Sequence, residues 1–129
     1  MKTNSQLNVA LHTLGHIAAS QGEALTSEEL AACAGTNPVV VRRVLGVLRR
    51  ANIVASTRGR SGGWTLTKKP NEITLGQIHE ALSPEQDNEQ QQKTCTIADR
   101  LESRLQAALQ RASLSMRNEL DQTTLKDLI

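Results

Sequence analysis

Residues 26–43 read TSEELAACAGTNPVVVRR, and this stretch encodes two helices joined by a tight turn. Thr26 followed three residues later by Glu29 is a capping box, which begins the first helix. Gly35 suits the left-handed residue that ends a helix. Asn37 is a good N-cap, and the proline after it fits the first position of the next helix, where no amide donor is needed. The stretch therefore predicts a helix-turn-helix.

The second helix of this pair is expected to run to about Ala51 and to be amphipathic. Its predicted buried face is made of Val41, Val44, Leu45 and Leu48. Its outer face is left to Val39, Arg42, Arg43, Gly46, Arg49 and Arg50. The first residues of such a helix reach base edges in the major groove, and arginine pairs with guanine or holds phosphate. The alternative is that these arginines are ordinary solvated charges.

A β-hairpin is expected directly after this helix. Two short β-prone runs, Ile53–Ser56 and Trp64–Thr67, are separated by a segment rich in Gly and Arg. Arg58 and Arg60 would reach phosphates or a minor groove from the tip of this hairpin. The chain has no Phe or Tyr, so Trp64 is its only aromatic residue of this kind. We expect Trp64 to pack the root of the hairpin onto the helices rather than to stack on a base.

Further helices are expected on both sides of this unit. Residues 5–20 place apolar side chains at helical spacing, which predicts a first helix. Thr74 would cap a short helix, and a long helix is expected from Thr96 onward. Residues 123–129 have the pattern of a capped turn that docks on another part of the protein.

The long helix carries an apolar stripe that needs a partner. The stripe consists of Ile97, Leu101, Leu105, Ala108, Ala112 and Met116. We expect it to pair with its copy in a homodimer, the alternative being that it packs on its own domain. Two-fold proteins bind palindromic operators, so dimerisation and DNA binding support each other. The expected domains are a DNA-binding domain over 1–82, a polar flexible linker over 83–95, and a dimerisation helix with its tail over 96–129.

Length and composition limit the class of protein. The 129 residues suffice for one domain with an extension. Residues 1–69 hold nine Lys and Arg against three Asp and Glu, whereas residues 70–129 hold six against ten, which suggests that the first half meets a polyanion. An uneven but merely solvated surface is the alternative. No membrane-length apolar run and no secretion leader is present, so we expect a cytoplasmic protein. No catalytic constellation is present, so we do not expect an enzyme.

These motifs together resemble the Rrf-two (BadM-type) family of bacterial winged helix-turn-helix transcription regulators. The resemblance is carried by Leu7–Ala18, by residues 30–48, by the wing from Ile53 to Leu66, where Trp64 replaces the usual Tyr, and by residues 70–82. It implies a mainly α fold with a small β-hairpin wing, and a homodimer crossed at the long helix. It also implies control of promoters through double-stranded DNA, which we expect to be repression.

The resemblance adds Val39, Val40, Arg42 and Arg58 as positions that match DNA contacts in the family. Together with the analysis of the helix and the hairpin, it gives a predicted DNA-binding set of Thr36, Asn37, Val39, Val40, Arg42, Arg43, Arg49, Arg58 and Arg60. The operator, the regulated genes and the effector cannot be identified from the sequence.

The cysteines depart from the family pattern. Members that bind an iron–sulfur cluster carry three closely spaced cysteines near the start of the long helix, whereas this chain has only Cys95 there. A cluster needs several thiolates, so we expect no cofactor and place the chain in the cluster-free branch. A hypothesis remains that Cys33 and Cys95 of opposite subunits form a disulfide that responds to oxidants. The alternative, which we expect for Cys33, is that of a small buried apolar residue.

Two other classes of function remain open. The winged helix could dock on another protein, with its basic face incidental, or the chain could be a metal or redox sensor. His12 and His16 stand at i, i+4 on the first predicted helix, a spacing that can chelate a metal ion. No carboxylate or thiol stands near them in the sequence, so we do not expect a metal site.

Overall fold

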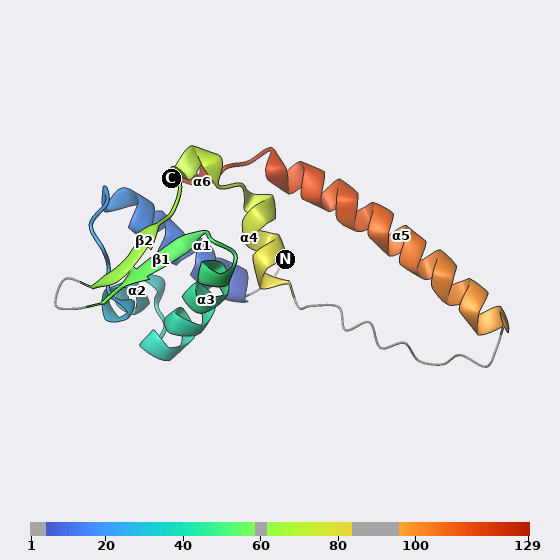
Figure 1. The fold of residues 1–129 in the computed structure, drawn as a ribbon, viewed down its shortest axis with the longest axis horizontal. Helices are drawn as coiled ribbons and strands as arrows, with labels where there is room; N and C mark the ends of the chain where they lie inside the picture. The colour runs from blue at the N-terminus through green and yellow to red at the C-terminus, as the bar shows by residue number, and fades with distance from the viewer. Residues whose placement is uncertain (1–4, 59–61, 84–95) are drawn as a thin grey trace.

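The computed structural model describes residues 5–58, 62–83 and 96–129. This part of the chain is mainly helical, with one two-stranded antiparallel hairpin (Figure 1), as the sequence predicted. In chain order the elements are α1 (Ser5–Ala19), α2 (Ser27–Ala34), α3 (Pro38–Arg50), β1 (Val54–Thr57), β2 (Gly63–Leu66), the short 3-10 turn η1 (Pro70–Glu72), α4 (Leu75–Leu82), α5 (Thr96–Asp121) and α6 (Leu125–Leu128).

Helix α1 is the centre of the core. It contacts α2, α3, β2, α4 and α6. Its inward residues Ala10, Leu14 and Ile17 are buried, as their helical spacing predicted. Thr13 is buried among them, and its hydroxyl donates to the carbonyl oxygens of Val9 and Ala10, so no polar atom of this side chain is left unpaired.

The helix-turn-helix forms with the predicted caps. The hydroxyl of Thr26 accepts a hydrogen bond from the Glu29 amide at 3.1 Å, and the Glu29 carboxylate accepts one from the Thr26 amide at 3.3 Å. Gly35 ends α2 at φ 68°, in the left-handed region. Helix α3 then buries Val41, Val44, Leu45 and Leu48, the face predicted from the sequence. It ends at Arg50, one residue before the predicted end.

The hairpin is extended by a third segment of backbone. Strands β1 and β2 pair from Val54–Leu66 to Thr57–Gly63, and Leu25 exchanges two backbone hydrogen bonds with Trp64 on the other edge. This approach is so close that a Cβ on Gly63 would lie 2.5 Å from the Leu25 carbonyl oxygen. A glycine is therefore required where the wing joins the segment that precedes α2.

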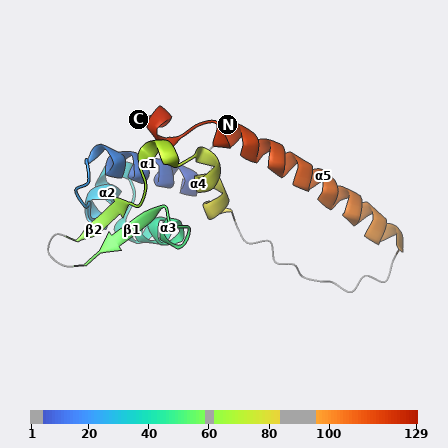
Figure 2. The same ribbon diagram turned by 45° about the horizontal axis from the view of Figure 1, so that its top comes forward.

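Helix α5 projects away from the rest of the molecule, and both views show this (Figure 1 and Figure 2). Its C-terminal end lies on α4. The chain then turns back, because the Leu75 amide donates to the Thr123 carbonyl and the Leu125 amide donates to the Ile73 carbonyl, each at 2.8 Å. Leu125 is 1% exposed and belongs to the same core as α1. The predicted docking of the tail is confirmed, and its site is the chain's own core.

No helix in the described ranges combines the length and the apolar character that a membrane crossing requires.

Candidate nucleic-acid interface

The outer face of α3 is basic and accessible. Arg42, Arg43 and Arg49 are exposed, and Arg50 extends the same face. Val39 lies near the start of the helix with 58% of its surface exposed. Because the opposite face of α3 is fully used by the core, this outer face is free to enter a groove of DNA.

Three predicted site residues at the start of α3 also have local structural roles. The Asn37 side chain accepts a hydrogen bond from the Val40 amide at 3.0 Å, which caps the helix. Thr36 is half-buried, and its amide donates to the Ala31 carbonyl. Val40 is half-buried against the core. The turn therefore fixes the backbone direction from which Val39 and Arg42 point outward.

Arg42 forms an ion pair with Glu28 of α2 at 3.6 Å. Both side chains are more than half exposed, and such surface pairs contribute little to stability. The pair places the guanidinium of Arg42 near the first turn of α2.

The wing lies next to the C-terminal half of α3. Arg49 donates to the Ser56 hydroxyl of β1 at 3.1 Å. Arg58 follows β1 and is exposed, whereas Arg60 lies outside the described residues. The Gly63 amide donates to the Thr57 hydroxyl at 3.1 Å, which closes the paired part of the hairpin. The exposed arginines of α3 and Arg58 of the wing thus belong to neighbouring elements of one surface.

Trp64 anchors the wing to the helices. Its indole Nε1 donates to the hydroxyl of Ser27, which is 8% exposed, at 3.0 Å. Its ring is half-buried against the core. The prediction that Trp64 packs the hairpin onto the helices is confirmed, but this residue lies near the loop end of the paired strands and not at their root.

The predicted dimer stripe of α5 is open to solvent in the single chain. Ile97 is 70% exposed and Leu101 is 66% exposed. The other four residues of the stripe are also exposed: Leu105, Ala108, Ala112 and Met116. Monomeric proteins rarely leave a contiguous apolar surface of this kind uncovered.

The chain matches the sequence profile of Rrf2, described as an iron-dependent transcriptional regulator, over residues 3–129. A Bacillus subtilis protein named as an HTH-type transcriptional regulator, YwnA, is 33% identical over 130 residues, which cover 98% of this chain and 96% of that protein. The chain belongs to the Rrf2 family.

Solved structures agree with this assignment. A crystal structure described as a DNA-binding protein superposes on the Rrf2 chain with a TM-score of 0.75 at 31% identity, covering 95% of this chain and 97% of the other. The structure of CymR, the global cysteine regulator of Bacillus subtilis, gives a TM-score of 0.66 at 25% identity and covers 99% and 95%. This Rrf2 protein is a DNA-binding transcriptional regulator and not an enzyme.

The family description includes iron dependence, which requires side chains that can hold the metal. Iron–sulfur clusters are held by several cysteine thiolates, and this sequence has two cysteines. Cys33 lies on α2, and Cys95 lies outside the described residues. In the ranges that the structure describes, no three His, Cys, Asp or Glu side chains form a group that could hold a metal ion. The donor set does not fit a cluster of this kind.

The expected burial of Cys33 is wrong, because this residue is exposed. Helix α2 turns Ser27, Leu30 and Ala31 inward, and Cys33 shares its outer side with Glu29, one turn earlier. His12 and His16 are exposed on α1. They line an open groove of about 470 Å³ between α1 and α6, whose other lining residues are Leu11, Gly15, Ala19, Leu125, Leu128 and Ile129.

Sequence reasoning missed the side chains that hold this surface in place. Glu28 pairs with Arg42 across the turn, Ser56 accepts from Arg49, and Ser27 accepts from Trp64. Each joins two elements, so no short-range spacing indicates it. Ser27 and Glu28 are also common residue types at the start of a helix, and Ser56 lies in a strand. The local sequence pattern therefore explains these residues without their distant partners.

Proposed function

We propose that this Rrf2 protein represses transcription by binding a palindromic operator as a homodimer. The single observation that carries the proposal is the exposed arginine face of α3 beside the wing arginine Arg58. Helix α3 would enter the major groove, and the wing would follow the phosphate backbone. In this arrangement residues 1–82 read DNA, residues 83–95 link the parts, and residues 96–129 provide the dimerisation helix α5 with a tail that returns to the core of the same chain.

The roles of individual side chains follow from their positions. Arg42 and Val39, near the start of α3, would contact base edges. Arg43, Arg49, Arg58 and Arg60 would hold phosphates. Thr36, Asn37 and Val40 would place the helix, and the Thr36 hydroxyl could add a phosphate contact. Removing Arg42 should therefore change base preference, whereas removing a phosphate contact should weaken binding to every sequence.

Dimerisation would bury the α5 stripe against its copy. The exposed apolar side chains of this stripe support the proposal, because pairing two such helices removes them from water. The experiment is sedimentation equilibrium combined with selection of bound sequences from random DNA. Leu101→Glu should give a monomer that binds the palindrome weakly. Ser103→Glu, which adds the same charge on the opposite side of α5, is the control and should remain a dimer.

We also propose a cytoplasmic location and a response to thiol oxidation through Cys33 and Cys95. The exposure of Cys33 supports access by an oxidant. The structural similarity to CymR, the global cysteine regulator of Bacillus subtilis, supports a signal related to sulfur chemistry. Mass spectrometry after mild oxidation should detect a Cys33–Cys95 peptide between subunits. If neither that peptide nor a change in operator binding is found, the thiol response is excluded. Repression itself is tested by a promoter fusion with and without the protein.

A further inference from the structure

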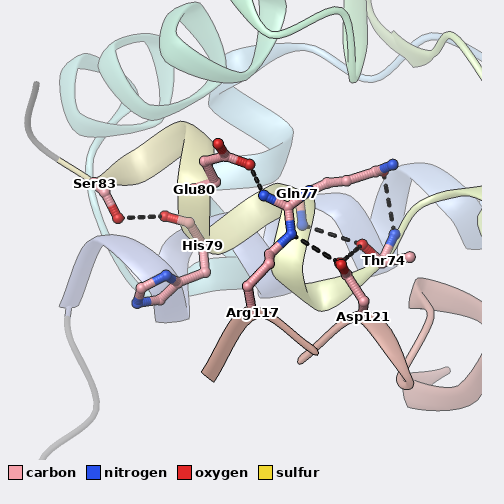
Figure 3. A network of polar contacts seen from close by, with 7 residues as sticks. All are labelled: Thr74, Gln77, His79, Glu80, Ser83, Arg117 and Asp121. Carbon is pink, nitrogen blue, oxygen red and sulfur yellow. Dashed lines mark hydrogen bonds and ion pairs between the residues drawn. The ribbon is translucent and has the colours of Figure 1, made fainter. Parts of the chain in front are cut away.

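The last turns of α5 are fixed to α4 by linked polar contacts (Figure 3). The Thr74 hydroxyl, at the N-cap of α4, donates to the Asp121 carboxylate at 2.8 Å. Arg117 Nε donates to both oxygens of the same carboxylate at 3.0 Å, and the guanidinium also forms an ion pair with Glu80. We call Thr74, Glu80, Arg117 and Asp121 the clamp.

The backbone of α4 comes unusually close to the clamp. Gly76 is buried, and a Cβ at this position would lie 2.1 Å from Asp121 Oδ1 and 2.8 Å from Arg117 Nε. No larger residue fits beneath the two side chains unless they move. The missing side chain of Gly76 therefore allows the end of α5 to sit directly on α4.

The chain is held again immediately after the clamp. The Thr123 carbonyl accepts from the Leu75 amide, and Leu125 is buried in the core. Helix α4 in turn contacts α3, the helix that carries the basic face. A continuous set of packed elements thus runs from α3 through α4 to one end of α5.

The clamp and the dimer stripe occupy opposite faces of α5. At about 100° per residue, Arg117 and Asp121 point about 150–170° away from the centre of the stripe that runs from Ile97 to Met116. The clamp therefore fixes α5 to its own domain without covering the stripe. Helix α5 has 26 residues and is about 39 Å long, so a rotation of about 10° at the clamp would move its far end by about 7 Å.

We propose that Arg117 and Asp121 are positioning residues that set the separation of the two DNA-reading heads, and so the spacing of operator half-sites that the dimer accepts. The inference rests on the proposed homodimer. By fixing the angle between α5 and α4, the clamp fixes where each α3 lies relative to the two-fold axis. One added base pair turns a half-site by about 35° and moves it by about 3.4 Å, so a rigid dimer tolerates such a change poorly.

The test uses the full-length protein and a set of duplexes that carry its selected half-sites with spacers changed by one or two base pairs. The wild type should prefer one spacing by about tenfold or more over its neighbours. Arg117→Gln and the isosteric Asp121→Asn should each reduce that preference to about threefold or less, through a loss at the best spacing together with a relative gain at the others. Arg117→Lys, which keeps the charge but not the forked geometry, should lie between. Arg100→Gln, which removes the same charge from the far end of α5, should behave as wild type.

The outcomes separate this inference from the proposed function. A wild-type protein that is monomeric or ignores DNA overturns the proposed function, and the positioning role with it. A wild-type dimer that binds its palindrome but shows no spacing preference overturns the positioning role alone. The same holds if both clamp variants remain dimers with the wild-type profile, or lose affinity equally at all spacings, as a purely structural role would give. If Arg117→Gln fails to fold, Asp121→Asn decides.

Discussion

The indole Nε1 of Trp64 donates a hydrogen bond to the Ser27 hydroxyl at 3.0 Å, which ties strand β2 of the wing to the first turn of α2. The backbone of Leu25, two residues before Ser27, exchanges two hydrogen bonds with the backbone of Trp64. These contacts join the paired strands of the wing to the start of the helix-turn-helix.

Ser27→Ala should lower the free energy of unfolding by about 1 kcal/mol, because the half-buried indole N–H loses its acceptor. Denaturant unfolding followed by Trp fluorescence measures this, since Trp64 is the only tryptophan. Ser113→Ala, on the exposed surface of α5, is the control and should change stability little. Equal stability of the two variants would show that the hydrogen bond adds nothing.

Gly63→Ala should destabilise the protein by about 2 kcal/mol or more, because the new methyl group meets the Leu25 backbone. Gly46→Ala is the matched control. A Cβ on Gly46, inside α3, meets nothing within 4 Å, so alanine there should stabilise the helix by about 0.5–1 kcal/mol. Thermal unfolding of both variants gives the comparison, and a stable Gly63→Ala protein would contradict the close approach.

Arg58→Ala and Arg42→Ala should weaken DNA binding in different ways. Loss of Arg58, for which we propose a phosphate contact, should weaken binding to all sequences and reduce the slope of log affinity against log salt by about 1. Loss of Arg42 should cost about 1–3 kcal/mol at the selected operator and relax the preference at one base pair. Fluorescence anisotropy at several salt concentrations, with operator and scrambled duplexes, distinguishes them. Identical salt slopes and base preferences for both variants would contradict these roles.

Glu28→Gln should strengthen DNA binding, because it releases Arg42 and removes a negative charge beside the phosphates. Stability should change by less than about 1 kcal/mol, since the pair is exposed. Glu29→Gln is the comparison for this variant. Glu29 is also exposed on α2, but its carboxylate completes the capping box. A Glu28→Gln protein with unchanged or weaker affinity would show that Arg42 gains nothing from its release.

The contribution of Asp121 to stability should disappear in acid. Hydrogen bonds from Thr74, and then from Arg117, hold the pKa of the Asp121 carboxyl below its ordinary value of 3.8. Because the pKa is lower in the folded protein, this stabilisation is fully present above the unfolded-state pKa and is lost as the pH falls through the folded-state pKa. The stability difference between wild type and Asp121→Asn should therefore be constant from pH 5 to 7 and shrink below about pH 4. A difference that persists unchanged at pH 2 would contradict this account.

Local structure could be predicted where short-range chemistry decides it. Thr26, Asn37 and Thr74 were predicted as caps, and each accepts the expected backbone hydrogen bond. The buried face of α3 also follows from the spacing of its valines and leucines. In each case the relevant partners lie within four residues, so the sequence alone contains the information.

Contacts between distant segments could not be predicted in this way. Thr74 and Asp121 are 47 residues apart, and Thr74 already had a role as a cap, so nothing in the sequence pattern paired them. The i, i+4 spacing of Arg117 and Asp121 indicates a helix-surface pair but not its place on α4. Cys33 was misjudged because cysteine is commonly buried, whereas its side of α2 is decided by Leu30 and Ala31.

Leu125 completes a core whose other members lie between residues 10 and 78. During translation, this apolar site stays unfilled while the long helix is being made. At ordinary synthesis rates the delay is roughly 2–10 s. A nascent chain in that interval leaves apolar side chains of its interior in contact with water.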